Sequence, residues 1–237
     1  MLILFDIDLT LLNTGGSGAR SMLAAGRELF GPQFSTDGVP FAGRLDPLII
    51  SDLFTRGGVP PTAGAIAEFT SRYQRCLAHE LARTPSCTAL PGVLDLITAL
   101  DAHRLRVPAL ALGILTGNFE PTGTMKLDRC GIPLAPFEVR VWGDHSPNDP
   151  PRRSDLVPVA MRRYESLRQR PLPPADVVVI GDTPHDVHAA LSHGCRALAV
   201  TTGRSSSSEL RDAGAHLVVP DLSDTSSISR WLLAGAR

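Results

Sequence analysis

The sequence has little of what marks several classes of protein. Its 237 residues include four cysteines, none of them in a CxxC pair, so the pattern indicates neither a zinc site nor a disulfide framework. The formal net charge is only -1, and no block of basic or acidic residues offers a surface for nucleic acid. No apolar run is long enough to span a membrane. We expect a cytoplasmic protein with no nucleic-acid or membrane partner.

The chain does have short apolar runs that alternate with helical patterns. Residues 1–5 are apolar throughout, which is typical of a strand covered on both faces in a parallel sheet. From residue 91 onward, expected strands alternate with expected helices, which predicts an α/β doubly wound parallel sheet, a Rossmann-like core. The further strands are expected at 107–115, 139–142, 177–180, 196–200 and 216–219, and the helices at 92–103, 121–130, 154–168, 184–192, 206–213 and 225–233.

The segment between the first strand and residue 91 has a different pattern. Helices are expected at 19–30, 46–56 and 62–83, separated by Gly and Pro breakers, and no convincing strand is found between residues 14 and 90. A block made only of helices at this point predicts an inserted helical cap. We therefore expect a cap of residues 15–90 and a core formed by residues 1–14 and 91–237.

Polar residues follow three of the expected strands. Ligand sites in open parallel sheets lie at the carboxyl ends of the strands, so these residues could form one pocket. Several carboxylates in one pocket repel one another unless a cation lies among them, and a hard divalent ion such as Mg2+ suits oxygen ligands. The residues are Asp6, Asp8 and Thr10 after the first strand, Thr116, Gly117 and Asn118 after the second, and Asp182 and Asp186 after the third.

The order of these residues resembles the haloacid dehalogenase (HAD) superfamily, specifically its phosphoglycolate phosphatase-like phosphatases. Residues 6–10 match the DxDx[TV] motif, Thr116 matches the Ser or Thr that follows an apolar strand, and residues 181–186 match GDxxxD. Each motif alone is weak, but three in order at consistent spacing are specific. The resemblance covers nearly the whole chain, including a helical insertion between the first two motifs.

The resemblance implies a role for each matching residue. Asp6 would be the nucleophile that takes up the phosphoryl group, and Asp8 would be the general acid and then the general base. The metal ion would be held by the Asp6 carboxylate, the Asp8 backbone carbonyl and Asp182. The other expected site residues are Thr116, Gly117 and Asn118 around the phosphoryl oxygens, and Asp186 and Thr10 in supporting positions. Thr10 could equally bond the loop backbone, Asn118 cap the next helix, and Asp186 cap or orient its neighbours.

Two positions depart from the family pattern. The family has a lysine before GDxxxD, but the only lysine here, Lys126, lies ten residues after Thr116, at a place expected to be on the surface and too early for that role. Arg153 is the expected substitute in contact with phosphate, although the sequence does not say whether it or Arg152 points inward. Leu9 stands where relatives usually have glycine, and a positive φ there would cost about 1 kcal/mol.

The resemblance implies a Mg2+-dependent phosphomonoesterase acting on a small phosphorylated metabolite, with phosphoglycolate as the family default. Arg44, in the cap loop of residues 41–46, is a candidate for binding a substrate carboxylate or second phosphate, and equally a surface arginine. Asp8 disfavours a dehalogenase, and the lack of lysine in residues 14–90 disfavours phosphonate cleavage. A phosphomutase and a non-catalytic, regulatory phosphate-binding protein remain alternatives. A monomer and a weak homodimer are both compatible with the sequence.

Overall fold

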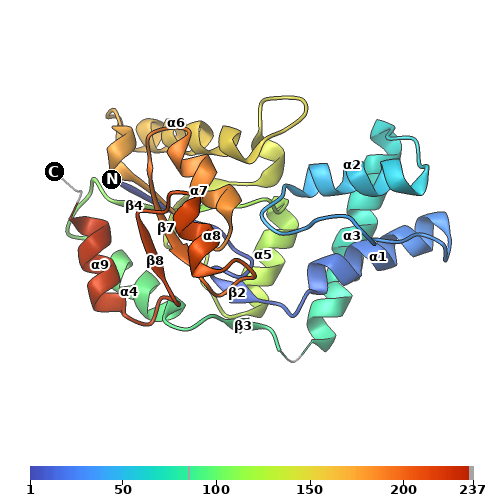
Figure 1. Ribbon diagram of the computed structural model, residues 1–237, viewed down its shortest axis with the longest axis horizontal. Helices are drawn as coiled ribbons and strands as arrows, with labels where there is room; N and C mark the ends of the chain where they lie inside the picture. The colour runs from blue at the N-terminus through green and yellow to red at the C-terminus, as the bar shows by residue number, and fades with distance from the viewer. Residues whose placement is uncertain (85, 235–237) are drawn as a thin grey trace.

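A parallel sheet forms the centre of the larger part of the molecule in the computed structural model, which describes residues 1–84 and 86–234 (Figure 1). Six strands lie in the order β5-β4-β1-β6-β7-β8, and each neighbouring pair is parallel. The predicted α/β doubly wound sheet is confirmed. The strands are β1 Leu2–Phe5, β4 Ala111–Leu115, β5 Phe137–Val141, β6 Val177–Gly181, β7 Arg196–Val200 and β8 Leu217–Val219.

Helices cover both faces of this sheet. Three of them pack with it in one apolar cluster, and three others pack with it in a second cluster. Every residue of β1 is buried, because the strand has neighbours on both edges and helices on both faces, so its sequence is apolar without alternation. The first group comprises α4 Val93–Arg104, α5 Glu120–Arg129 and α9 Thr225–Leu233, and the second α6 Leu156–Arg168, α7 Pro184–Leu191 and α8 Ser207–Asp212.

Three further helices stand beside the sheet (Figure 1). These cap helices are α1 Ser17–Phe30, α2 Asp46–Gly57 and α3 Ala63–Arg83. They pack around a cluster of aromatic rings whose centroids lie 5.4 to 6.3 Å apart. Its members are Phe30, Phe34, Phe54 and Phe69. Among the described residues, none of the helices is both long and apolar enough to cross a bilayer.

The chain enters and leaves the cap helices through two short strands. β2 Leu12–Asn13 pairs antiparallel with β3 Thr88–Ala89. The sequence did not predict β3, because two residues are too few for hydrophobic periodicity to show. This pair lies next to the predicted boundaries at residues 15 and 90, and the division into core and cap remains our prediction.

Candidate active site

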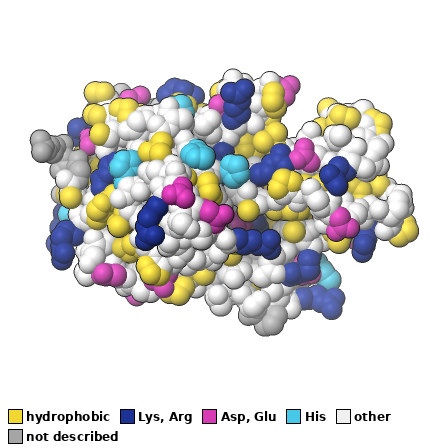
Figure 2. All heavy atoms as spheres, viewed as in Figure 1, with side chains coloured by type: hydrophobic (Ala, Val, Ile, Leu, Met, Phe, Trp, Pro, Cys, Tyr) yellow, Lys and Arg dark blue, Asp and Glu magenta, His cyan; other side chains and the backbone are white. Residues whose placement is uncertain are grey.

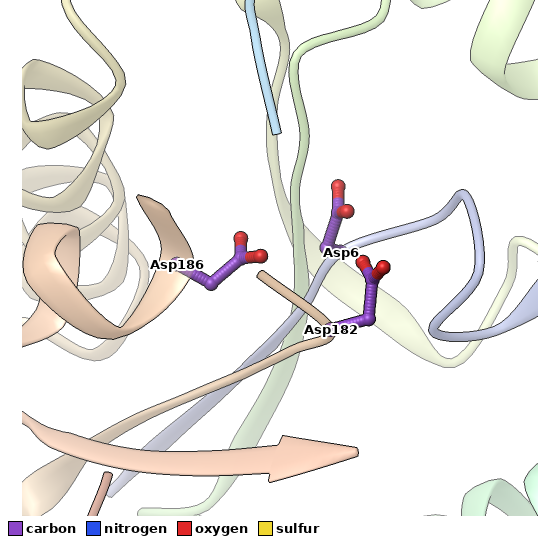
Figure 3. A group of neighbouring side chains, drawn as sticks. All are labelled: Asp6, Asp182 and Asp186. Carbon is purple, nitrogen blue, oxygen red and sulfur yellow. The ribbon is translucent and has the colours of Figure 1, made fainter. Parts of the chain in front are cut away.

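Three buried carboxylates lie close together at the carboxyl end of the sheet, with Asp186 directed toward Asp6 and Asp182 (Figure 3). Asp6 follows β1, Asp182 follows β6, and Asp186 lies in the first turn of α7. One oxygen from each lies within 4.8 Å of the other two. The register explains part of this meeting, because Phe5 and Ile180 are partners in neighbouring strands and the acids come just after them. The predicted convergence of the first and third motifs is therefore found.

Burial and nearby negative charges raise the pKa of two of these acids, Asp6 and Asp182. Burial raises the pKa of Asp6 to about 6, with Arg153 opposing the shift and the charges of Asp186 and Asp8 adding to it. Burial, together with Asp186 and Asp6, raises the pKa of Asp182 to about 8. A divalent cation bound by these oxygens would offset both the burial and the repulsion, and carboxylate oxygens are the ligands that Mg2+ prefers. The cluster therefore fits a divalent metal ion.

Arg153 brings a positive charge into this cluster. Its Nη2 lies 3.0 Å from Asp6 Oδ1 and 2.5 Å from Asp186 Oδ1, and its Nε donates to the same Asp186 oxygen at 2.9 Å. Burial alone would lower the pKa of Arg153, but the two carboxylates outweigh it and raise that pKa. Arg152 is exposed. Of the two arginines left open by the sequence, Arg153 is the one that points inward.

Asp186 also caps a helix. Its Oδ2 accepts hydrogen bonds from the backbone N–H of Thr183 at 3.1 Å and from its hydroxyl at 2.7 Å, at the start of α7. Its Oδ1 is the atom bound by Arg153. Asp186 thus does both things that the sequence suggested, since it caps α7 and orients a neighbour in the site.

A second polar network surrounds Asp8. Lys126 Nζ donates to Asp8 Oδ2 at 2.7 Å and to Asn118 Oδ1 at 2.6 Å. Asn118 Nδ2 donates to Asp8 Oδ2 at 2.9 Å and to Thr116 Oγ1 at 2.8 Å. The Asn118 side chain therefore joins the loop after β4 to Asp8 and does not cap α5, whose first turn receives no side-chain cap from the residue before it.

The prediction that Lys126 lies on the surface is wrong. The residue is 4% exposed and belongs to the buried face of α5. Its position in the helix was the available signal, because α5 begins just after Asn118 and Lys126 follows about two turns later, on the same side. Side chains in a helix lean toward its N-terminus, so a long lysine there reaches back to the end of β4.

The loop after β1 has a positive φ at the position where the sequence left that conformation open. Leu9 has φ of 56°, in the left-handed region that glycine adopts without penalty. Its carbonyl accepts a hydrogen bond from Thr202 Oγ1 at 2.5 Å, which helps to hold this conformation. Thr10 is buried, and its Oγ1 lies 3.5 Å from Asp182 Oδ1, so it faces the acid cluster.

The cap loop (residues 41–46) rests on the loop after β4. Asp46 N donates to Gly117 O at 2.7 Å, and its Oδ2 accepts from Phe119 N at 3.2 Å and from Thr122 Oγ1 at 3.4 Å. Only glycine fits at 117, because a Cβ there would lie 2.0 Å from Arg44 O. Burial raises the pKa of Asp46 to about 7. This buried acid between cap and core was not predicted.

Arg44 lies in the same loop, but its side chain pairs with a residue outside the acid cluster. Its guanidinium forms an ion pair with Asp52 of α2, and its side chain is 20% exposed. The loop nevertheless reaches the site through its backbone, because Arg153 Nη1 donates to Gly43 O at 3.4 Å. On the surface, a hollow with Lys or Arg side chains at its edge lies between the cap helices and the core (Figure 2).

Known proteins are similar to this chain in sequence and in fold. A family model described as HAD-hydrolase-like matches residues 156–225. A phosphoglycolate phosphatase from Chromobacterium violaceum is 28% identical over 163 residues, and one from Nitrosospira multiformis is 23% identical over 228 residues. The chain is therefore similar to HAD-superfamily hydrolases, phosphoglycolate phosphatases among them.

The extent of these matches differs. The match to the Chromobacterium relative covers 66% of this chain but only 60% of that relative, whereas the Nitrosospira match covers 95% of this chain and 94% of that relative. The fold is shared with a solved structure of CbbY from Rhodobacter sphaeroides in complex with phosphate. That structure has a TM-score of 0.72 and 23% sequence identity, and the match covers 94% of this chain and 95% of that one.

Proposed function

We propose that this chain is a Mg2+-dependent phosphomonoesterase of the HAD superfamily that hydrolyses a small phosphorylated metabolite through an aspartyl phosphate on Asp6. The observation that carries the proposal is the meeting of Asp6, Asp182 and Asp186 at one edge of the sheet. Asp8 follows two residues after Asp6 and is joined to Thr116 through Asn118. This set offers a nucleophile, an acid and base, a cation site and a donor for phosphoryl oxygens. Phosphoryl transfer needs mostly such positioning and charge stabilisation.

Two proton transfers by Asp8 accompany the two steps of the reaction. In the first, a carboxylate oxygen of Asp6 bonds to phosphorus as the ester P–O bond breaks, and the leaving oxygen keeps the electron pair and takes a proton from Asp8. In the second, water gives a proton to the Asp8 carboxylate as its oxygen bonds to phosphorus. The bond between phosphorus and Asp6 then breaks, which restores the Asp6 carboxylate and releases phosphate.

The cation would be bound by the Asp6 carboxylate, the Asp8 backbone carbonyl and Asp182. Asp186 suits an orienting role better than that of a direct ligand, because both of its oxygens already accept hydrogen bonds. Mg2+ bound there would stabilise the negative charge that develops on the phosphoryl group. Arg153 would hold Asp6 in place and face the phosphoryl group, as a substitute for the family lysine.

A small phosphate ester is supported as the substrate by the names of the two phosphoglycolate phosphatases and by the phosphate bound to CbbY. We propose that the cap loop, which lies over the loop after β4, selects the substrate. Arg44 would have to leave Asp52 before it could bind a substrate carboxylate or second phosphate. A cytoplasmic location and a monomeric or weakly dimeric state remain predictions.

Phosphate release from p-nitrophenyl phosphate tests the proposal, measured for the wild type and Asp6→Asn with Mg2+ or with EDTA. We expect release by the wild type in Mg2+ only. Release that does not need a divalent cation, or an active Asp6→Asn protein, would contradict the mechanism. If phosphate or trifluoroberyllium binds at Asp6 but no ester in a broad panel is hydrolysed, the chain is a phosphate-binding protein without catalytic activity.

A further inference from the structure

The only lysine of the chain is buried beside the proposed acid and base. Its side chain is 5% exposed, whereas the Asp8 side chain is 41% exposed. A buried ammonium group is costly unless it is paired and hydrogen-bonded, and Lys126 meets that need with acceptors at 2.6 and 2.7 Å. Lys126 is therefore fixed in place, and Asp8 is the more accessible member of the pair.

The two side-chain hydrogen bonds to the Asp8 carboxyl that the described residues make fall on one oxygen. Among residues 1–84 and 86–234, Lys126 Nζ and Asn118 Nδ2 are the side-chain groups that donate to the Asp8 carboxyl, and both bind Oδ2. Two donors on the same oxygen set the rotation of the carboxyl group. The Oδ1 atom is left to carry a proton and to face a ligand.

The pocket around Lys126 Nζ is completed by the cap helices. A Cβ added at Gly18 of α1 would lie 3.4 Å from Lys126 Nζ and 3.6 Å from the hydroxyl of Tyr73 in α3. The lysine thus lies where α5 of the core meets two cap helices. A purely structural function would be to attach the cap to the core, and the experiment has to distinguish that function from a role in the reaction.

We propose that Lys126 is a positioning residue for Asp8. With Asn118, it holds Oδ2 so that Oδ1 carries the proton to the leaving oxygen of the substrate and accepts the proton of water in the next step. This proposal rests on the proposed function, in which Asp8 is the general acid and base. Arg153, bound to Asp6 and Asp186, acts on the other acids of the site and has no contact with the Asp8 side chain among the described hydrogen bonds.

The leaving group of the substrate reveals this role. When an alkyl phosphate such as glycerol 2-phosphate is cleaved, its alcohol departs as a poor alkoxide leaving group unless it receives a proton. When p-nitrophenyl phosphate is cleaved, a stable phenolate departs and needs little help from an acid. General acid catalysis contributes on the order of a hundredfold or more to a rate, so a misplaced acid should slow the alkyl ester far more than the aryl ester. If the cation only bound phosphate or attached the cap, its removal would slow hydrolysis of both esters by the same factor.

The experiment compares kcat/KM for the two esters in the wild type, Lys126→Met, Asp8→Asn and the double variant. We expect the fall in kcat/KM caused by Lys126→Met to be about tenfold or more greater for the alkyl ester than for the aryl ester. In the Asp8→Asn protein, Lys126→Met should not change the ratio of kcat/KM between the two esters any further, because its effect passes through Asp8. The ratio of two substrates in one sample does not depend on the fraction of molecules that are folded.

Arg153→Met is the matched control, since it removes the other buried cation of the site. It should lower kcat/KM by the same factor for both esters. Equal losses for both esters in Lys126→Met would overturn the role of Lys126 while leaving the proposed function intact. An additional leaving-group preference in the double variant would overturn it as well. If the wild type hydrolyses neither ester in Mg2+, the proposed function fails, and the role of Lys126 fails with it.

Discussion

Arg153 Nη2 lies 3.0 Å from Asp6 Oδ1 while the same guanidinium binds Asp186 through two nitrogens. One buried cation therefore links the proposed nucleophile to the residue that caps α7. A planar guanidinium can bind two carboxylates at once, which a single ammonium point charge does less well. This geometry explains how a site without the family lysine in its usual place keeps Asp6 and Asp186 fixed next to each other.

Removing that guanidinium should be costly in both stability and activity. Arg153→Met leaves Asp6 and Asp186 without their partner, so we expect the free energy of unfolding in EDTA to fall by about 3–5 kcal/mol. Activity in Mg2+ should fall on the order of a hundredfold. Urea unfolding and steady-state kinetics measure the two effects. Arg152→Met is the matched control, because Arg152 is exposed and its loss should change stability by less than about 0.5 kcal/mol. Similar losses in both variants would refute this role of Arg153.

Binding of Mg2+ should release protons. The raised pKa values, about 8 for Asp182 and about 6 for Asp6, mean that the acids hold protons below those values and must lose them to bind a cation. The apparent affinity for Mg2+ should therefore rise with pH up to about 8, by as much as about tenfold per pH unit for each proton released. Calorimetry in two buffers with different ionisation enthalpies measures the proton count. An affinity that stays constant between pH 6 and 8 would contradict this prediction.

Asp46 should make the stability of the protein depend on pH. Its pKa of about 7 lies above the ordinary value of 3.8, so the folded protein holds this proton more tightly than the unfolded chain does. The stabilising contribution is complete below 3.8 and is lost as the pH rises through about 7. Asp46→Asn cannot ionise, so its free energy of unfolding relative to the wild type should increase by a few kcal/mol between pH 4 and 8.

Urea unfolding in excess Mg2+, which keeps Asp6 and Asp182 ionised, isolates the effect of Asp46. Asp46→Ala is the companion variant, because it loses the acceptor for Phe119 N–H and Thr122 Oγ1 and should be less stable than the wild type at low pH. A difference between Asp46→Asn and the wild type that does not change with pH would show that Asp46 is ionised in the folded protein.

Leu9 tests the strained loop after β1. With φ at 56°, a β-branched side chain at this position should be worse than leucine, and glycine should be tolerated. We expect Leu9→Val to lower the free energy of unfolding by about 1 kcal/mol or more, and Leu9→Gly to leave it within about 1 kcal/mol of the wild type. Thermal unfolding of the two variants decides the matter. A Leu9→Val protein as stable as Leu9→Gly would mean that the loop relaxes from this conformation.

The sequence predicted features that depend on one element or on neighbouring strands. Asp6 and Asp182 converge because each ends a strand of continuous apolar residues, and such strands are buried side by side in a parallel sheet. Glycine is usual at the Leu9 position of the motif, which raised a positive φ as an open question, and the structure has one there. The strand expected at 107–115 begins only at Ala111, because its first apolar residues form the turn that leads into it.

What the sequence did not predict are contacts between distant segments. Lys126 lies on a helix whose periodicity shows a buried side but not what that side contacts, and it meets Asp8 across 118 positions of the chain. Asp46 belongs to the cap, yet its carboxylate accepts the N–H of Phe119 in the core. Such pairs depend on how the cap helices sit on the sheet, and no spacing within one element contains that information.

Chemical trapping of the phosphorylated enzyme tests the central claim most directly. With enzyme in excess over an ester substrate and Mg2+, an acid quench within one turnover should preserve the acyl phosphate, and borohydride should then reduce it. The mechanism predicts that mass spectrometry finds homoserine in place of Asp6, and that Asp8→Asn accumulates more of it because the second step is slowed. Substrate turnover with no modification at Asp6, or with the phosphoryl group on another residue, would contradict the account.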